Sequence, residues 1–294
     1  MRKLVAILVV LLLLTACASP AATPTSAPAS EEKVPTATPA PEAPAEAASG
    51  HISLAGSTTV QPLAEKLAEA FKAANPDVEI DVAGGGSSVG VKSAGEGAAD
   101  IGMASREVKQ SELDTYTNLN VVAIAYDGIA VGVHPDVAVD DLTIEQVRDI
   151  FAGAITNWSE VGGADEMIVV VAREEGSGTR GAFEELVMGK EGPQITDTAI
   201  LLPSNGAVRT TVSTTPNAVG FLSFGYLDGT VKALSVNGVA ATEANAGNGS
   251  YPVVRPLNMM TDGTPEGAAA AFLDFILGGE GQAVVAEEGY ITLQ

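Results

Sequence analysis

The chain has 294 residues, and its 15 Lys and Arg side chains against 37 Asp and Glu give a formal net charge of −22. Phosphate backbones are held by basic side chains, so this acidic balance argues against nucleic acid as the main partner. One Cys and two His exclude a disulfide framework and a Cys-based zinc site, and nearly exclude a His-rich metal centre. We expect no metal and no cofactor.

The N-terminus has the pattern of a secretory signal. Arg2 and Lys3 precede an apolar run that ends at Leu14, too short to span a bilayer and typical of a signal peptide. The run continues as Leu14-Thr15-Ala16-Cys17, which resembles the bacterial lipobox. The resemblance implies that residues 1–16 are removed and that Cys17 becomes the lipidated first residue. An ordinary cleavage site with an incidental Cys is the alternative.

Residues 17–49 have the composition of a tether. Residues 18–49 contain seven of the 16 Pro, with Ala, Thr, Ser and scattered Glu, and no large apolar residue besides Val34. Such a segment cannot bury a core, so we expect a disordered linker between the lipid anchor and the folded body. The body would then be displayed outside the cell, anchored to the membrane through its lipid.

From residue 50 onward, short apolar runs alternate with helical patterns, which predicts an α/β fold. The expected strands are residues 51–55, 78–82, those around Ile101, 121–125, 128–133 and 168–171. The expected helices are residues 61–74, 89–95, 144–151 and 179–188, with a helical pair within 265–288. Two apolar passages, residues 128–133 and 251–257, are predicted to cross between two lobes. Residues 50–131 with 254–294 would form lobe 1, and 132–253 lobe 2.

Three loops rich in Gly, Ser and Thr each follow a predicted strand and open a predicted helix. A helix N-terminus presents unpaired N–H groups and the positive end of the helix dipole, and the hydroxyls add donors. One such loop alone is explained by ordinary N-capping. Three of them, one preceded by Arg173, favour an anion site. The loops are Gly56-Ser57-Thr58-Thr59, Gly84-Gly85-Gly86-Ser87-Ser88 and Gly176-Ser177-Gly178-Thr179.

Enzyme motifs overlap two of these loops. Residues 86–90 fit the GxSxG nucleophile motif with Ser88 as nucleophile, but only His134 follows it, and it follows too soon for that fold. Residues 176–181 fit the dinucleotide motif GxGxxG, but two Glu side chains precede it and would repel a pyrophosphate. We therefore expect that the chain is not an enzyme, and keep a secreted serine hydrolase using Ser88 as a minor alternative.

The body resembles the phosphate-binding proteins of bacterial phosphate ABC importers, which are class II periplasmic-type solute-binding proteins. The similarity extends over residues 50–294 and rests on several stretches taken together. These are GSTTVQPLAEKLAEAF, GGGSSVGVKSAGEGAADIGMASR, DLTIEQVRDIFAGAITNWSEVGG, VVVAREEGSGTRGAF, SNGAVRTTVSTTPNAVGFLSFGY and AAAAFLDFILGGEGQAVVAEEGYITL. The resemblance implies a type II fold with two lobes, each a sheet flanked by helices, joined by a two-strand hinge.

The resemblance also implies which residues bind the anion. The first loop supplies an anion-binding turn, the second a binding serine, and the third the hydroxyl and N–H groups that close the site, while an arginine pairs with the anion. In this chain these residues are Ser57, Thr58, Thr59, Ser87 with Ser88 beside it, Arg173, Ser177, Gly178 and Thr179.

One position departs from the family pattern. In well-known members an Asp follows the Ala-Ser of the third strand and accepts the proton of hydrogen phosphate, which excludes sulfate. Arg106 occupies that position here. Many relatives with Ser-Arg at this place are also regarded as phosphate binders, so we include Arg106 among the phosphate-binding candidates. The usual basis for choosing phosphate over sulfate is nevertheless missing.

The sequence thus predicts a lipid-anchored, extracytoplasmic binding protein. It would capture inorganic phosphate between its lobes and deliver the ion to the permease subunits of an ABC transporter. We expect a monomer, a membrane attachment through the lipid alone, and no nucleic acid partner. A binding protein for another oxyanion (sulfate, molybdate or tungstate) is the main alternative.

Overall fold

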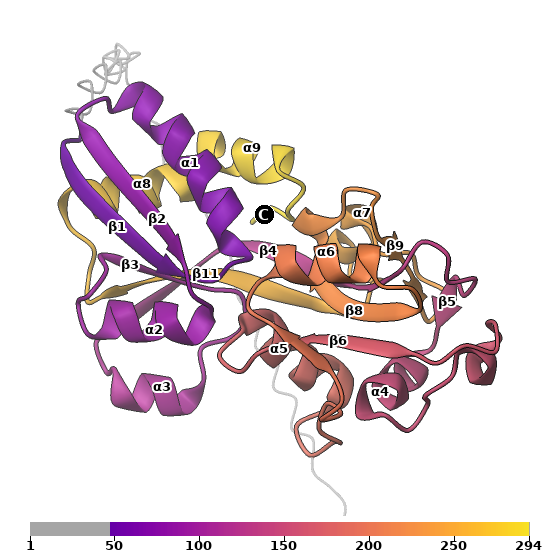
Figure 1. Ribbon diagram of the computed structural model, residues 1–294. Coiled ribbons are helices and arrows are strands. Elements are labelled where there is room, and N and C mark those ends of the chain that lie inside the picture. The colour runs from indigo at the N-terminus through magenta and orange to yellow at the C-terminus, as the bar shows by residue number, and fades with distance from the viewer. Residues whose placement is uncertain (1–47, 294) are drawn as a thin grey trace, which may run out of the picture. The chain divides into compact units, whose positions relative to one another are not determined.

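The computed structural model describes residues 48–293, which belong to one compact unit, Glu46–Gln294 (Figure 1). The predicted signal peptide (1–16), the lipidated Cys17 and the predicted tether up to residue 47 lie outside the described residues. Strands and helices alternate along the body, as the sequence predicts.

The first part of the body alternates strictly between strands and helices. Its elements are β1 (Gly50–Gly56), α1 (Val60–Ala74), β2 (Val78–Gly84), α2 (Ser87–Gly95), β3 (Ile101–Ala104), α3 (Gln110–Thr115) and β4 (Leu119–Val133). The middle part follows with β5 (Asp141–Leu142), α4 (Ile144–Ala152), a 3₁₀ turn (Trp158–Val161), β6 (Val169–Arg173), α5 (Gly178–Phe183), a π-helical turn (Glu184–Met188), β7 (Ile200–Leu202), α6 (Asn205–Thr214) and β8 (Ala218–Ser223).

The remaining elements return the chain to its first half. They are a 3₁₀ turn (Phe224–Tyr226), β9 (Lys232–Ala233), β10 (Ser235–Val236), α7 (Glu243–Gly247), β11 (Val254–Asp262), α8 (Gly267–Leu277) and α9 (Gly279–Glu287). Among the described residues, no single helix is long and apolar enough to cross a membrane. The consecutive helices α8 and α9 reach that length and composition only together, across a bend of 65°.

One nine-stranded sheet runs through both halves of the body in the order β2-β1-β3-β11-β4-β8-β6-β7, with β9 on β4. The first half contains β1–β3, α1–α3, α8 and α9, and the second half contains β5–β10 and α4–α7. The long strands β4 and β11 pair antiparallel from Val254 opposite Gly128 to Asp262 opposite Leu119. In the first half, α1 and α8 cover one face of the sheet and α2 the other, while α6 and α5 cover opposite faces in the second half (Figure 1). This is an α/β architecture of two lobes joined by two crossing strands, as predicted.

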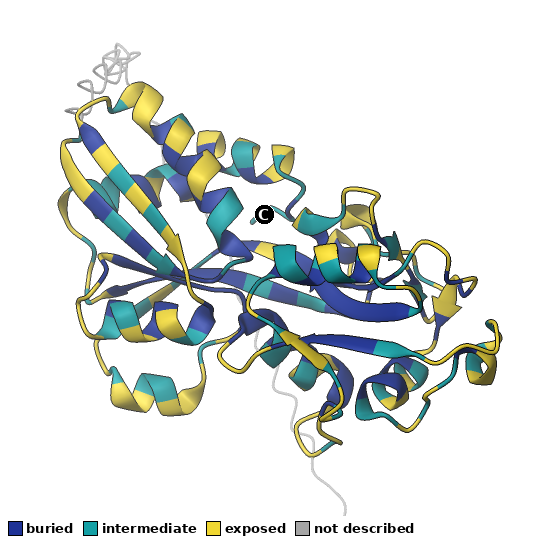
Figure 2. Ribbon diagram, in the orientation of Figure 1, coloured by how far each residue is buried: buried dark blue, intermediate teal, exposed yellow. Residues whose placement is uncertain are grey.

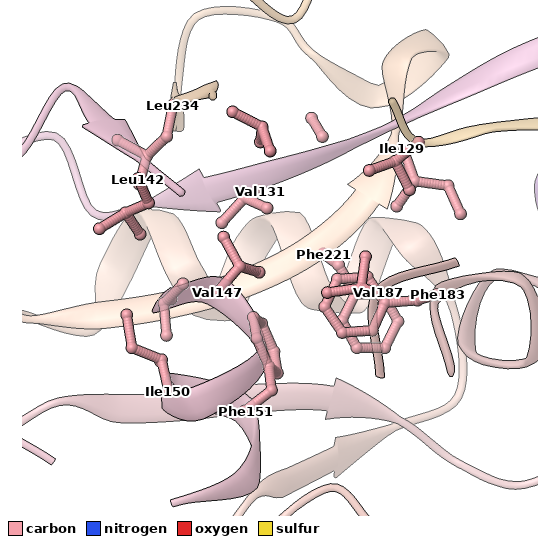
Figure 3. Packing of buried hydrophobic residues seen from close by; sticks show 14 of the residues in the cluster. Ile129, Val131, Leu142, Val147, Ile150, Phe151, Phe183, Val187, Phe221 and Leu234 are labelled. Carbon is pink, nitrogen blue, oxygen red and sulfur yellow. The ribbon is translucent and has the colours of Figure 1, made fainter. Parts of the chain in front are cut away.

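Each half has its own hydrophobic core. In the first half, the core contains Leu54, Leu67 and Phe272 and includes Ala125 of β4. In the second half, Phe151, Phe183 and Phe221 form the centre of a separate cluster, with the rings of Phe183 and Phe221 stacked at 4.2 Å between centroids (Figure 3). Along β4, core membership changes between Ala125 and Ile129. Figure 2 shows the central strands buried and the outer helices buried on one side only.

Two differences from the predicted elements have physical causes. The expected strands 121–125 and 128–133 are a single strand, because β4 continues through Tyr126 and Asp127 by pairing with β11. The elements α6 and β8 were not predicted. All six residues of β8 are buried, so the strand has no alternation of polar and apolar residues to reveal it.

Helix α2 lies unusually close to β3. A Cβ atom at Gly90 would overlap the backbone of Met103, and one at Gly102 would overlap the carbonyl oxygen of Gly90. The two glycines therefore allow backbone-to-backbone contact, and this contact holds the N-terminus of α2, with Ser87, next to the end of β3.

We expect Gly90→Ala to lower the free energy of unfolding by about 1–3 kcal/mol, the usual cost of forcing extra volume into a packed interior. Urea unfolding followed by the fluorescence of the buried Trp158 measures this. Gly279→Ala, at the start of α9 with open space around it, is the matched control and should leave stability unchanged or slightly higher. Equal stability of the two variants would contradict the close-packing argument.

Candidate functional site

Buried hydroxyl groups from loops far apart in the sequence meet at the carboxyl ends of the strands. Ser57 and Thr59 follow β1, Ser87 follows β2, Ser105 follows β3, and Thr179 follows β6. We call these five residues the hydroxyl cluster. Each is at most 1% exposed. Carboxyl ends of parallel strands are the usual place for ligands in open α/β sheets.

The hydrogen bonds of this cluster connect the two halves of the body. The hydroxyls of Thr59 and Thr179 lie 3.1 Å apart, although 120 residues separate them in the sequence. Ser57 Oγ donates to Ser105 Oγ at 2.9 Å, and Ser105 N–H donates to Ser87 Oγ at 3.0 Å. The loops that the sequence analysis grouped by composition are therefore in contact in space.

The second and third loops also touch through their backbones. Ser88 N–H donates to the carbonyl oxygen of Gly176 at 3.1 Å. A Cβ atom at Gly178 would overlap the hydroxyl of Ser87, so only glycine fits between α2 and α5 at this point. The first residues of α2 and α5 have N–H groups with no partner inside their own helix. These donors lie beside the hydroxyl cluster.

N-capping accounts for only part of this arrangement. Ser177 does cap α5, because its Oγ accepts from Arg180 N–H at 3.2 Å. Thr59, the N-cap residue of α1, makes no side-chain cap bond. The hydroxyl of Thr59 therefore faces other partners.

Arg173 brings an unneutralised charge to this place. It is 1% exposed, and it forms no ion pair with any of the described residues. Its Nε and Nη2 donate to the backbone carbonyls of Leu202 and Pro203 at 3.1 and 2.8 Å. Burial, together with the nearby charge of Arg255, lowers the pKa of Arg173 to about 10. A guanidinium held in this way is poised to receive an anion.

A second buried arginine lies under the hydroxyl cluster. Arg255 of β11 is paired with Asp127 of β4 through bonds of 2.8 and 3.1 Å, and neither side chain is more than 1% exposed. Burial raises the pKa of Asp127, and the charge of Arg255 opposes that shift. Arg255 also donates to Thr59 Oγ1 at 3.1 Å and to the carbonyl oxygen of Ser105 at 3.1 Å.

The buried charges therefore do not balance within the protein. Arg173 and Arg255 are two cations, and within residues 48–293 Asp127 is the one carboxylate that pairs with either of them. Isolated charges are costly to bury. A bound anion at the hydroxyl cluster would neutralise the excess positive charge.

Arg106 is oriented away from this cluster. Its guanidinium forms a two-pronged bond with Glu112 at 2.7 and 2.8 Å, and Nη2 also donates to Ser88 Oγ at 3.1 Å. Burial would raise the pKa of Glu112, but the bonds from Arg106 and from Lys109 N–H outweigh it and leave that pKa below its usual value. The charge of Arg106 is thus already neutralised.

A polar cavity of about 430 Å³ lies beside the site. Residues of both halves line it, including Ser88, Arg106 and Lys109 from the first half and Ser177 and Arg180 from the second. It shares Ser88, Arg106 and Ser177 with the predicted site residues. We regard it as the polar surround of the site.

The structure brings Ser57, Thr59, Ser87, Gly178 and Thr179 together, and Ser88, Arg106 and Ser177 line the adjoining cavity. Arg173 is buried and bonds to the backbone just before α6, whose Asn205 contacts Thr59 and Thr179. Thr58 differs from its neighbours. Its methyl group faces Gly84, its buried hydroxyl has no hydrogen-bond partner, and its carbonyl accepts from the Tyr226 hydroxyl at 2.7 Å.

Sequence reasoning missed four residues of this environment, namely Ser105, Asp127, Asn205 and Arg255. Each is at most 3% exposed. A signal for two of them was available, because Asp127 and Arg255 are charged residues inside largely apolar strands. Such charges usually require a partner.

Ser88 lacks the surroundings of a catalytic nucleophile. Its hydroxyl accepts from Arg106, whereas the ring of His134 contacts Asp136. Ser88 and His134, the pair required by the hydrolase alternative, are therefore not brought together. Within residues 48–293, no group of three or more His, Cys, Asp and Glu side chains is arranged to hold a metal ion.

The comparisons with known proteins agree on one family of binding proteins. A family model described as a PBP superfamily domain matches residues 41–280. The phosphate-binding protein PstS of Bacillus subtilis is 36% identical over 250 residues, which cover 84% of this chain and 82% of that protein. PstS of Pseudomonas aeruginosa is 31% identical over 274 residues, covering 83% of this chain and 84% of its own.

Solved structures are similar over the same region. A protein assigned as a phosphate ABC transporter substrate-binding protein, from Clostridium perfringens and with bound phosphate, is 45% identical with a TM-score of 0.80. The match covers 83% of this chain and all of that one. An ABC-type phosphate transport receptor from Vibrio cholerae is 34% identical with a TM-score of 0.69, covering 82% of this chain and all of that one.

The charge arrangement makes a prediction about stability. Asp127→Asn leaves Arg255 buried without its counter-charge, and we expect a loss of about 3–5 kcal/mol in the free energy of unfolding. Asp228→Asn, which removes the partner of the surface residue Arg209, is the matched control and should cost less than about 1 kcal/mol. Denaturant unfolding of both variants without ligand measures the difference, and equal losses would contradict it.

Proposed function

Because this chain belongs to the PBP superfamily and, within it, to the PstS family of phosphate-binding proteins, we propose that it captures inorganic phosphate at the hydroxyl cluster. The type II fold with two lobes is common to the chain and this family. In this proposal, the ligand is a small tetrahedral oxyanion that is bound and released unchanged.

The observation that carries the proposal is Arg173, a buried guanidinium with no carboxylate partner among the described residues. It bonds to the carbonyls of Leu202 and Pro203, just before Asn205, whose side-chain amide reaches Thr59 and Thr179 of the hydroxyl cluster. Hydrogen bonds to a charged group contribute about 1.5–3 kcal/mol each, so several donors together can offset the cost of removing a dianion from water.

We assign the ligand contacts to the predicted residues that the fold brings together. Arg173 would supply the charge. The hydroxyls and backbone N–H groups at the starts of α2 and α5 would surround the oxygens, with Ser87, Ser177, Gly178 and Thr179 nearest, and Thr59 would lie behind Thr179. Ser57 would support Thr59, and Ser88 and Arg106 would line the edge, with Thr58 contributing through its backbone.

Lobe motion would admit and release the ion. In our assignment, residues 50–131 with 254–294 form lobe 1 and residues 132–253 form lobe 2. Thr59 and Thr179 belong to different lobes in this division, so their contact would exist only in a closed state. Opening about β4 and β11 would separate the donors and free the ligand.

Transport supplies the biological role in this proposal. The relatives in Clostridium perfringens and Vibrio cholerae are described as ABC transporter or transport-receptor proteins. We propose that this chain likewise delivers phosphate to the permease of an ABC transporter, as a monomer outside the cytoplasm and tethered through a lipid on Cys17. No enzymatic step is required.

Arg106 keeps one alternative open, namely a different oxyanion. The family's proton-accepting Asp is replaced by a donor, so sulfate or molybdate lacks that particular obstacle. Calorimetric titration of the body with phosphate, arsenate, sulfate and molybdate decides between them. Sulfate or molybdate binding at least as tightly as phosphate would overturn the phosphate assignment and leave the binding-protein class intact.

We expect Arg173→Met to weaken phosphate binding about 100-fold or more, because the variant loses the charge-assisted bonds to the anion. Calorimetry measures the dissociation constant, and thermal unfolding checks that the variant is folded. Arg148→Met is the matched control. Arg148 lies in α4 and bonds to the Val187 carbonyl, so its loss should not change the affinity. Unchanged binding by Arg173→Met would remove Arg173 from the site.

Anchoring has its own test. In full-length chain expressed in a bacterium with lipoprotein processing, Cys17→Ser should move the protein from the membrane fraction to the soluble fraction. Metabolic labelling with a fatty acid should mark the unaltered chain but not the Cys17→Ser variant. Ala18 offers a neighbouring control position, and Ala18→Ser should remain in the membrane. Labelling of the Cys17→Ser variant would contradict lipidation at Cys17.

A further inference from the structure

Thr59 has an unusual set of neighbours. Its Oγ1 receives Nη2–H of Arg255 at 3.1 Å and Nδ2–H of Asn205 at 2.8 Å, and it lies 3.1 Å from Thr179 Oγ1. The three partners come from β11, α6 and α5. All of them are at most 2% exposed, so water does not compete for these bonds.

The orientation of the Asn205 amide is fixed by a further bond. Its Oδ1 accepts from the backbone N–H of Ser223 at 3.2 Å. An N–H can only donate, so the oxygen of the amide must face Ser223 and the nitrogen must face Thr59. The guanidinium of Arg255 likewise has no acceptor.

These bonds determine the direction of the Thr59 proton. A hydroxyl has two acceptor positions and one proton. The two donors, Arg255 and Asn205, occupy both acceptor positions of Thr59 Oγ1. Its proton must then point to the remaining neighbour, Thr179 Oγ1. Thr179 thereby accepts from Thr59, and its own proton is left to donate elsewhere.

Arg255 also faces a second chain of hydrogen-bonded hydroxyls, which runs through Ser105. Ser57 Oγ accepts the backbone N–H groups of Thr59 and Val60 at 3.1 and 3.3 Å, so it donates to Ser105 Oγ. Ser105 Oγ also lies 3.4 Å from Nη1 of Arg255. With two donors facing Ser105, its proton is directed onward, and Ser87 Oγ lies 3.5 Å away.

The two chains of hydrogen bonds end at Thr179 and Ser87, and the hydroxyl protons of these two residues are free to donate to an anion. We propose that Arg255, held by Asp127, is a positioning residue that makes the hydroxyl cluster a set of donors directed at the anion. The proposal rests on the proposed function, since Thr179 and Ser87 are the residues that would contact the ligand. Arg255 itself does not touch the anion in this arrangement.

Geometry explains why this position needs arginine. The guanidinium binds Asp127 through Nε and Nη2, Thr59 through Nη2, and Ser105 through Nη1. A lysine at this position would preserve the charge but has a single nitrogen and could not reach all three partners together. Arg255→Lys therefore separates orientation from charge.

The test is a double-mutant cycle on phosphate affinity, measured by calorimetry with inorganic phosphate. We expect Arg255→Lys to weaken binding about 10-fold or more in the otherwise unaltered chain. In the Thr59→Val background, where the shorter chain of hydrogen bonds is absent and only the longer contact with Ser105 remains, the same change should cost about 3-fold or less. In the Thr59→Ser background, which retains the hydroxyl, the larger loss should return. Arg148→Lys is the matched control for the substitution and should not change affinity.

Several results would overturn the inference. Arg255→Lys binding as tightly as the unaltered chain would show that charge alone matters. An equal loss in the Thr59→Val and Thr59→Ser backgrounds would show that Arg255 does not act through that hydroxyl. Should Arg255→Lys fail to fold, the Thr59 variants still test the chain of hydrogen bonds that the proposal requires, because Thr59→Val must bind at least about 10-fold more weakly than Thr59→Ser, and equal binding would overturn the proposal.

The outcome is separable from that of the proposed function. If the unaltered chain prefers sulfate or another oxyanion, the phosphate assignment fails, and the same cycle measured with that anion still tests the role of Arg255. If the unaltered chain binds none of the four oxyanions, both proposals fail.

Discussion

The burial of Arg173 without a carboxylate is the constraint on which the rest of the site depends. The Arg173 guanidinium stays protonated at neutral pH, because even its lowered pKa is about 10. Two backbone carbonyls support it, but they supply no negative charge. The fold tolerates the free-energy cost of burying this charge because the two hydrophobic cores and the shared strands β4 and β11 fix the surrounding backbone. In the proposed function, binding of an anion would convert the unfavourable burial into an attraction, so the feature that lowers the stability of the protein without ligand would also provide its affinity.

Two other arginines near the site illustrate different solutions to the same problem. Arg255 is neutralised by Asp127 from the neighbouring strand, and its other N–H groups donate to the Thr59 hydroxyl and the Ser105 carbonyl. Arg106 is neutralised by Glu112 from its own half and lies at the edge of the site.

Replacing a carboxylate by arginine at position 106 would bring a further positive charge to the anion site. The two-pronged bond to Glu112 removes most of that effect, which explains how this position can tolerate arginine while the anion chemistry of the hydroxyl cluster is kept.

The sequence was a good guide to the loops and a poor one to what lies beneath them. Loops such as Gly84–Ser88 combine a strand end, a tight turn and a helix start, and these signals are local, so their positions could be predicted without a structure. Asn205 and Arg255 could not be found in this way, because their role arises from contacts with Thr59 across 146 and 196 residues. The register of β4 against β11, which places Arg255 opposite Asp127, is also a tertiary property. Only the presence of a charged residue inside each of these largely apolar strands hinted at it.

The net charge of −22 and the anion site are compatible because they act over different distances. Exposed carboxylates act through water, where salt screens them beyond about 8 Å at physiological ionic strength. Arg173 and the hydroxyl cluster act at hydrogen-bond distance in an interior that water does not reach. An acidic surface therefore slows the approach of an anion more than it weakens the bound state, whose energy is set by oriented donors. The orientation of those donors is in turn fixed by Arg255, so the choice of ligand depends on the direction of a few buried protons more than on the sum of charges.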